Sequence, residues 1–172
     1  MTQKFLLRLA RPDDLAGVDA LLARSYPRLL RPDYAPSIMV TLVPMIARAR
    51  PELLASRRYF VAEDAEGRIL AAGGFSLGAP GSTINAAGAV TSTAHIRHVA
   101  TDPDSTRQGI GRRLMHAIFG AAEAEGVTRY ECLSTLTAVP FYASVGFVAI
   151  GPVGVPLTPG LVFPAIRMRR IV

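Results

Sequence analysis

The segment from Ala94 to Glu125 constrains the fold of this 172-residue chain more than any other part of the sequence. A run of apolar and β-forming residues predicts a strand over 94–101. The turn after it carries Gly109 and Gly111 directly before a segment whose apolar residues recur at the helical period, which predicts a helix to about Glu125. A strand, a glycine-containing turn and an amphipathic helix in this order indicate an α/β domain.

The turn before this helix is suited to binding a phosphate group. The first N–H groups of a helix have no partner inside the helix, and the helix dipole makes that end partly positive. Glycines let the backbone approach an anion, and Arg107, Arg112 and Arg113 add positive charge. A P-loop would need Lys and Ser or Thr after the second glycine, and a dinucleotide fingerprint would need a third Gly or Ala at Leu114. From these residues alone, an ordinary helix start stays the alternative.

The remaining segments predict one domain that spans residues 1–172. Strands are expected at 4–9, 59–63, 69–77, 94–101, 130–134, 147–150 and 162–170. Helices are expected from residue 11 to about 26, at 37–49 with a break near Pro44, at 110–125 and at 138–145. Loops are expected from Pro27 to Pro36, at 78–92 and at 151–160, because these stretches are rich in Pro, Gly and small residues.

Composition narrows the classes of function. No apolar run approaches the roughly 20 residues of a membrane helix, and the first residues lack a signal-peptide layout. The single cysteine, Cys132, can form no internal disulfide and cannot supply a metal site with several thiolate ligands. We therefore expect a cytoplasmic protein without a metal. Eighteen of the nineteen basic residues are Arg, within a net charge of +6. They are scattered, which argues against a nucleic-acid stripe and leaves a small phosphorylated ligand or a solvated basic surface as interpretations.

Residues 95–150 resemble the core of the GNAT N-acetyltransferase superfamily. The family's turn signature, Gln/Arg-x-x-Gly-x-Gly/Ala, aligns with Thr106 to Gly111, and only its first position departs from the pattern. A second block, Phe-Tyr-x-x-x-Gly-Phe, matches residues 141–147, with Thr137 where the family commonly has Asn. The two blocks are separated by the length of one helix and one strand, which strengthens the resemblance.

The resemblance implies a mixed, mostly antiparallel sheet with helices on both faces and a splayed strand pair that holds acyl-CoA. The pantetheine arm would pair with the main chain of Val99 and Thr101, and a main-chain N–H near Ala100 would polarise the thioester carbonyl. The pyrophosphate would lie on the turn that opens the long helix. The residues expected to contact coenzyme A are Val99, Ala100, Thr101, Thr106, Arg107, Gln108, Gly109, Ile110, Gly111, Arg112 and Thr137.

The same resemblance implies direct acetyl transfer from acetyl-CoA to a primary amine. Tyr142 matches the family's general-acid tyrosine, which protonates the departing thiolate. His95 lies four residues before Val99, where histone-modifying members carry a glutamate, and it is our candidate base, with Glu131 and a water chain as rivals. We expect Cys132 to be a small core residue, which disfavours a covalent cysteine mechanism.

The acceptor is the least determined part of the sequence. Residues 78–92 and 151–160 are uncharged, which disfavours a strongly cationic amine and leaves a small molecule or a protein amine as partner. We expect no nucleic-acid or membrane partner, and a homodimer is compatible with the resemblance. Departures at Thr106 and Thr137 leave open a module that binds acyl-CoA without turnover, and the Arg content leaves open nucleic-acid binding.

Overall fold

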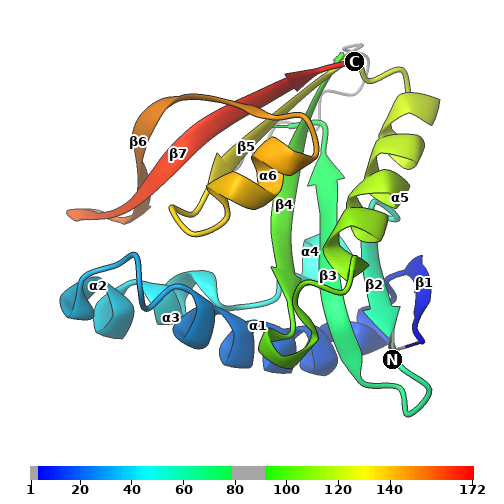
Figure 1. The fold of residues 1–172 in the computed structure, drawn as a ribbon, viewed down its shortest axis with the longest axis horizontal. Coiled ribbons are helices and arrows are strands. Elements are labelled where there is room, and N and C mark those ends of the chain that lie inside the picture. Colours follow the sequence, from blue (N-terminus) through cyan, green and yellow to red (C-terminus); the bar gives the residue numbers. More distant parts are fainter. Residues whose placement is uncertain (1–3, 79–91) are drawn as a thin grey trace.

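A seven-stranded sheet with strand order β1-β2-β3-β4-β5-β7-β6 organises the chain (Figure 1). The structure is a computed structural model that describes residues 4–78 and 92–172, so nearly all of the loop expected at 78–92 lies outside the described residues. The strands are β1 (Leu6–Leu9), β2 (Tyr59–Glu63), β3 (Ile69–Ser76), β4 (Thr93–Thr101), β5 (Arg129–Ser134), β6 (Val148–Thr158) and β7 (Leu161–Ile171). Only β4 and β5 run parallel, which confirms the mixed, mostly antiparallel sheet.

Helices cover both faces of this sheet, as expected. They are α1 (Leu15–Leu29), α2 (Pro36–Thr41), α3 (Val43–Ile46), α4 (Pro51–Leu54), α5 (Ile110–Ala124) and α6 (Val139–Ser144). Neighbouring strand residues point to opposite faces, so Ala62 belongs to the core under α5, and Val61 to the core under α1 and α4. A third cluster joins α2 and α3 to the β6–β7 hairpin. Among the described residues, no helix has the length and apolarity to cross a membrane.

One helix prediction needs correction, and a second is confirmed in part. The first helix does not end before Pro27 but continues through it to Leu29, because proline this close to a helix end disturbs only one of the last turns. The helix predicted at 37–49 is divided, which confirms the expected break, and α3 begins with Pro44 in its first turn, where the missing N–H costs nothing. The short helix α4, which begins at Pro51, was not predicted.

The loop predicted at 151–160 is wrong. Strand β6 continues to Thr158, and only Pro159 and Gly160 connect it to β7. Because β6 is the outermost strand of the sheet, its prolines need not donate a ladder hydrogen bond on the free side. The Pro and Gly residues of this segment are typical of a loop, but at the edge of the sheet they are compatible with a strand.

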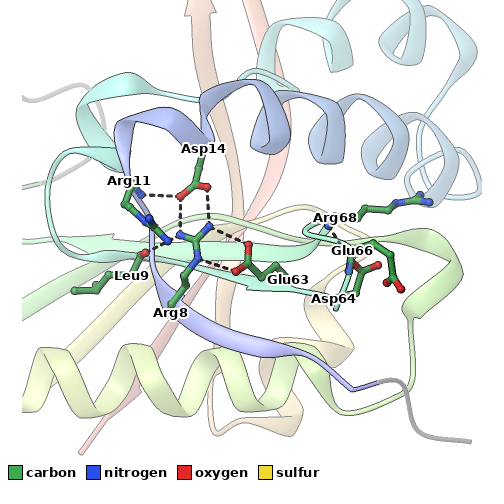
Figure 2. Close-up of polar contacts among 8 residues, drawn as sticks. All are labelled: Arg8, Leu9, Arg11, Asp14, Glu63, Asp64, Glu66 and Arg68. Atoms are coloured by element: carbon green, nitrogen blue, oxygen red, sulfur yellow. Dashed lines mark hydrogen bonds and ion pairs between the residues drawn. The ribbon is translucent and has the colours of Figure 1, made fainter.

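An ion cluster fixes β1 at the edge of the sheet (Figure 2). Arg8 on β1 donates hydrogen bonds of 2.8 Å to both carboxylate oxygens of Asp14 and a bond of 3.0 Å to Glu63 on β2. The hydrogen bond from Arg8 is the main reason that the pKa of Asp14 lies below its usual value. In the same view, Asp64 accepts hydrogen bonds from two main-chain N–H groups of the β2–β3 turn. This cluster is structural, since it lies beyond β3 from the opening between β4 and β5.

Candidate active site

The sheet opens between its two parallel strands. β4 and β5 are paired at only three positions, which end at His95 opposite Glu131. Beyond that pair each strand keeps its other neighbour, β4 pairing with β3 to Thr101 and β5 with β7 to Ser134. Figure 1 shows the two strands together near the C-terminus and diverging below it, with α6 in front of the widening gap. The splayed pair is therefore present.

A β-bulge in β4 lies beside the opening. Between the pairs Ala72–Ala100 and Gly74–Arg97, β4 has one residue more than β3, and His98 adopts a positive φ of 45°. The hydroxyl of Tyr59 donates a 2.8 Å hydrogen bond to the His98 carbonyl and holds this conformation. The side chain of His98 experiences the charges of Arg97, Arg50 and Glu52, on the face covered by α4. The bulge thus changes the regular alternation that would place His98 opposite His95.

The main chain at the end of β4 presents groups toward the gap. The N–H of Asp102 donates to Leu70 on β3 at 2.7 Å, and strand groups alternate in direction, so the main chain of Thr101 faces the opening. Its carbonyl accepts a 2.8 Å hydrogen bond from Ser25 of α1. Val99, beside the bulge, has no partner in the β3–β4 register, whereas Ala100 is paired with β3. The main-chain groups available around Ala100 are therefore those of its two neighbours.

The first turn of α5 presents unpaired amides. Arg107 and Gly109 have positive φ values of 61° and 80°, and Gly109 occupies the N-cap without a capping side chain. The first intrahelical bond runs from Arg113 N–H to the Gly109 carbonyl at 3.0 Å. The three amides of residues 110–112 precede it and have no helical partner. This is the arrangement that binds phosphate at helix N-termini.

Side chains around this turn differ in their availability. Arg107 and Arg112 are exposed, while the guanidinium of Arg113 lies over the ring of Phe5, 4.7 Å from its centroid. The hydroxyl of Thr106 donates to Pro103 in its own turn at 3.3 Å. Gln108 carries a buried Oε1 atom with no hydrogen-bond partner within the described part of the chain.

Gly111 brings the start of α5 against α6. A Cβ atom added at Gly111 would lie 3.1 Å from the ring of Phe141 and 3.6 Å from the hydroxyl of Thr101. Glycine at this position therefore lets the end of β4, the amides of α5 and the aromatic pair of α6 converge. The amides, the exposed arginines and the sheet opening together fit the diphosphate and extended arm of coenzyme A.

Asp102 anchors the turn that leads to these amides. It is only 1% exposed, and its carboxylate accepts hydrogen bonds from Arg24 at 2.8 Å, Arg68 at 2.9 Å and the N–H of Asp104 at 2.9 Å. Burial alone would raise the pKa of Asp102, but these bonds hold it below its usual value. Sequence analysis missed this residue, although an Asp that can cap a turn directly after a strand was a usable signal.

Tyr142 lies in the core at the opening. It is 7% exposed, and its ring contacts Phe141 and Phe147 with centroid distances of 5.3 and 5.4 Å. Its hydroxyl makes no hydrogen bond with the described residues. Burial raises the pKa of Tyr142 well above its usual value, and Cys132 and Tyr26 add to the rise. Tyr142 is carried by α6, which lies in front of the gap between β4 and β5 (Figure 1).

Cys132 occupies the same core as Tyr142, as expected. Cys132 is 4% exposed, and burial raises the pKa of its thiol to about 12. A thiol with this pKa is almost wholly protonated at neutral pH, and the thiolate is the nucleophilic form. Within residues 4–78 and 92–172, no group of three or more His, Cys, Asp or Glu side chains could hold a metal ion.

His95 and Glu131 are paired where the gap begins, and their side chains differ in charge and in hydrogen-bond partners. Burial lowers the pKa of His95 below 6.5, Glu131 opposes the shift, and nearby Arg97 and Arg167 reinforce it. Glu131 accepts hydrogen bonds of 3.1 Å from both Arg167 and Arg169. These bonds outweigh the effect of burial and keep the pKa of Glu131 below its usual value. His95 is therefore neutral and has no hydrogen bond among the described residues, whereas Glu131 stays charged and is paired with two arginines.

The loop after β5 is tied to the N-terminal half of the chain. The hydroxyl of Thr137 donates to Asp33 at 2.7 Å, so it is not free for a ligand in this structure. The N–H of Leu136 donates to the hydroxyl of Tyr34 at 2.9 Å, and that hydroxyl donates to the Pro164 carbonyl at 2.8 Å. Tyr34 thus fixes one wall of the opening, a role that its position in a Pro-rich segment did not indicate.

Comparisons with known proteins agree with this geometry. The family model for the acetyltransferase (GNAT) domain matches residues 43–157. A GCN5-related N-acetyltransferase from Rhodopseudomonas palustris is 19% identical, with 100% of this chain and 98% of that chain covered and a TM-score of 0.77. The PaiA N-acetyltransferase from Thermoplasma acidophilum, in complex with coenzyme A, is 14% identical, with 99% and 100% covered and a TM-score of 0.71.

A third similar structure is the ribosomal-protein-S18-alanine N-acetyltransferase from Escherichia coli, at 18% identity, 98% and 94% coverage and a TM-score of 0.61. At these identities the likeness concerns the fold. The family match covers more than half of the chain, including the α5 turn and the block around Tyr142. The chain belongs to the GNAT acetyltransferase family.

Proposed function

We propose that this chain is an acetyl-CoA-dependent N-acetyltransferase that transfers the acetyl group directly to a primary amine. The observation that carries the proposal is the juxtaposition of two features. Three amides without a hydrogen-bond partner among the described residues open α5. The gap between β4 and β5 begins at His95, and α6, which carries Tyr142, lies in front of it. Neither feature alone would distinguish an acyltransferase from another phosphate-binding protein.

The coenzyme A site would consist mainly of backbone. The amides of residues 110–112 would bind the pyrophosphate, and the exposed side chains of Arg107 and Arg112 would add charge. Main-chain groups of Val99 and Thr101 would pair with the pantetheine arm as an added strand does. The Thermoplasma acidophilum structure contains coenzyme A on the same fold, which supports this assignment.

The chain supplies three groups for the reaction, in which acetyl-CoA would provide the thioester. His95, neutral and without a hydrogen bond in the described residues, accepts a proton from the amine. The amine nitrogen bonds to the acetyl carbon as the carbon–sulfur bond breaks. Tyr142 donates its proton to the departing sulfur, and its raised pKa keeps that proton available at neutral pH. A main-chain N–H beside Ala100 polarises the carbonyl.

Rival groups fit less well. Glu131 is held by two guanidiniums and its pKa is low, which makes it a weaker base than His95. Cys132 is protonated and buried, so an acetyl-cysteine step would need a thiolate that this environment opposes. These two observations favour direct transfer.

Acetyl-CoA titration and a thiol-release assay across an amine panel test the proposal. Tyr142→Phe should lower kcat by at least about tenfold and leave the Kd for acetyl-CoA within about twofold, because it removes a proton donor and keeps the ring. Cys132→Ala is the matched control in the same core and should keep kcat. Acetyl-CoA binding without thiol release for any amine would instead indicate a non-catalytic binding module, and absence of binding would end both interpretations.

A further inference from the structure

The face of β4 that is directed toward α4 carries one cation, Arg97, between two histidines. His95 and His98 are neutral in their surroundings, and Arg97 lies between them. Arg50 and Glu52, at the start of α4, are the charged groups that act on Arg97. This face is opposite to the one covered by α5 and α6, where the first turn of α5 presents its amides.

Arg97 lacks an acidic partner. Among the described residues it forms one hydrogen bond, from Nη1 to the hydroxyl of Ser76 at 3.2 Å. No Asp or Glu within residues 4–78 and 92–172 forms an ion pair with it. The sequences of residues 1–3 and 79–91 contain no Asp or Glu, so these segments supply no side-chain carboxylate either.

The surroundings of Arg97 penalise its charge. Burial lowers the pKa of this half-buried guanidinium, Arg50 lowers it further, and Glu52 opposes the shift by a smaller amount. A desolvated cation beside a second cation is stabilised when an anion joins it. Most other half-buried arginines of the chain, such as Arg8 and Arg24, already hold carboxylates.

The other side of His95 carries excess positive charge as well. Glu131 is shared by Arg167 and Arg169, so one carboxylate balances two guanidiniums. The buried Nδ1 atom of His98 has no hydrogen-bond partner in the described residues. The candidate base therefore lies between cationic groups on both sides, a setting that attracts an anionic molecule and repels a polyamine.

We propose that the acceptor is a small amine that carries a carboxylate, and that Arg97 binds this carboxylate while the amine lies at His95. This inference rests on the proposed function. Residues two apart on one strand face are separated by about 7 Å, which an amino acid and its hydrogen bonds can span. Arg50 would add long-range attraction, because its side chain is exposed. Arg97 is thus a specificity-determining residue.

A matched acceptor panel tests this inference on the whole chain. Each α-amino acid is compared with its carboxamide, with the amine that lacks the carboxylate, and with its phosphonate analogue, by thiol release from acetyl-CoA. We expect kcat/KM for the amino acid to exceed that for the carboxamide by at least about tenfold, the usual effect of a charge-assisted hydrogen bond. A phosphonate that reacts better than the carboxylate would contradict the choice of carboxylate.

Arg97→Gln should raise KM for the amino acid by at least about tenfold and change kcat/KM for the carboxamide by less than about threefold. The control is Arg129→Gln, since Arg129 is an exposed arginine at the start of β5. This variant should change neither KM for the amino acid nor kcat/KM for the carboxamide. If Arg97→Gln does not fold, the wild-type panel decides alone. Equal use of carboxamides, cationic amines or protein amines overturns this inference but not acetyl transfer, whereas failure to bind acetyl-CoA removes the proposed function itself.

Discussion

His95 and Glu131 form the last cross-strand pair before β4 and β5 separate. His95 therefore lies where the opening begins. The residues of β4 before it are paired with β5, and those after it are paired only with β3. Two arginines of β7 hold Glu131 from the other side. The carboxylate therefore acts on His95 mainly through its charge, and the imidazole is the group left to exchange a proton with a ligand.

The first prediction concerns the titration of His95. Its pKa should lie below 6.5, because burial and two arginines disfavour the imidazolium. In Glu131→Gln the pKa should fall further, since the one neighbour that stabilises the imidazolium is removed while the arginines stay. NMR titration of the imidazole signals, assigned with His95→Gln, measures both values. A pKa above 6.5, or a rise in Glu131→Gln, would contradict this account.

A second prediction concerns stability at low pH. Burial lowers the pKa of His98 to about 4 from an ordinary value of 6.5. Between pH 4 and pH 6.5 the unfolded chain binds a proton at His98 that the folded chain does not. The free energy of unfolding is therefore highest, as far as His98 is concerned, above pH 6.5, and it decreases as the pH falls toward 4. The total is on the order of 3 kcal/mol.

His98→Asn isolates that contribution, because Asn tolerates the positive φ of the bulge. Urea unfolding at pH 7 and pH 4.5 should show a smaller loss of stability in the variant than in the wild type, by about 2 kcal/mol. Equal losses would mean that His98 is protonated in the fold. Carboxylates such as Asp14 also lose stability toward low pH, but they contribute equally to both proteins.

Much of the sheet and the α5 turn could be predicted from sequence, because both depend on local chemistry. Strand alternation and the Gly109–Gly111 turn are decided within a few residues, and they are found where they were expected. The error at β6 has the opposite cause. Pro152 and Pro156 are acceptable only because this strand lies at the edge, and edge position is a property of the whole sheet.

The charge balance around His95 could not be predicted from the sequence either. Arg97 and Glu131 are ordinary strand residues in the sequence, and their meaning depends on which partners are absent or present after folding. The bulge at His98 depends on a register with β3 that involves Gly73, where a Cβ atom would lie 2.7 Å from Val99. Such contacts join segments about 25 residues apart, and no local pattern encodes them.

A third prediction compares two carboxylates of one turn. Asp102→Asn should destabilise the fold by about 2 kcal/mol, because it leaves two guanidiniums without their buried anion, one of them partly solvated. Asp104→Asn is the control: its side chain is 69% exposed, and its pair with Arg28 is in solvent, so the change should cost less than about 0.5 kcal/mol. Chemical denaturation measures both. Equal effects would show that Asp102 does not anchor the turn.

The last prediction uses two glycines of the α5 region whose added methyl groups meet nothing within 4 Å. Gly109 has a φ of 80°, so Gly109→Ala forces a side chain into the left-handed region and should cost about 1 kcal/mol. Gly120, in the middle of α5, has ordinary helical geometry, so Gly120→Ala should stabilise the protein by about 0.5–1 kcal/mol. Only the first change should also raise the Kd for acetyl-CoA, because it distorts the amides that would bind the diphosphate. A Gly109→Ala protein with unchanged affinity would mean that these amides do not form the site.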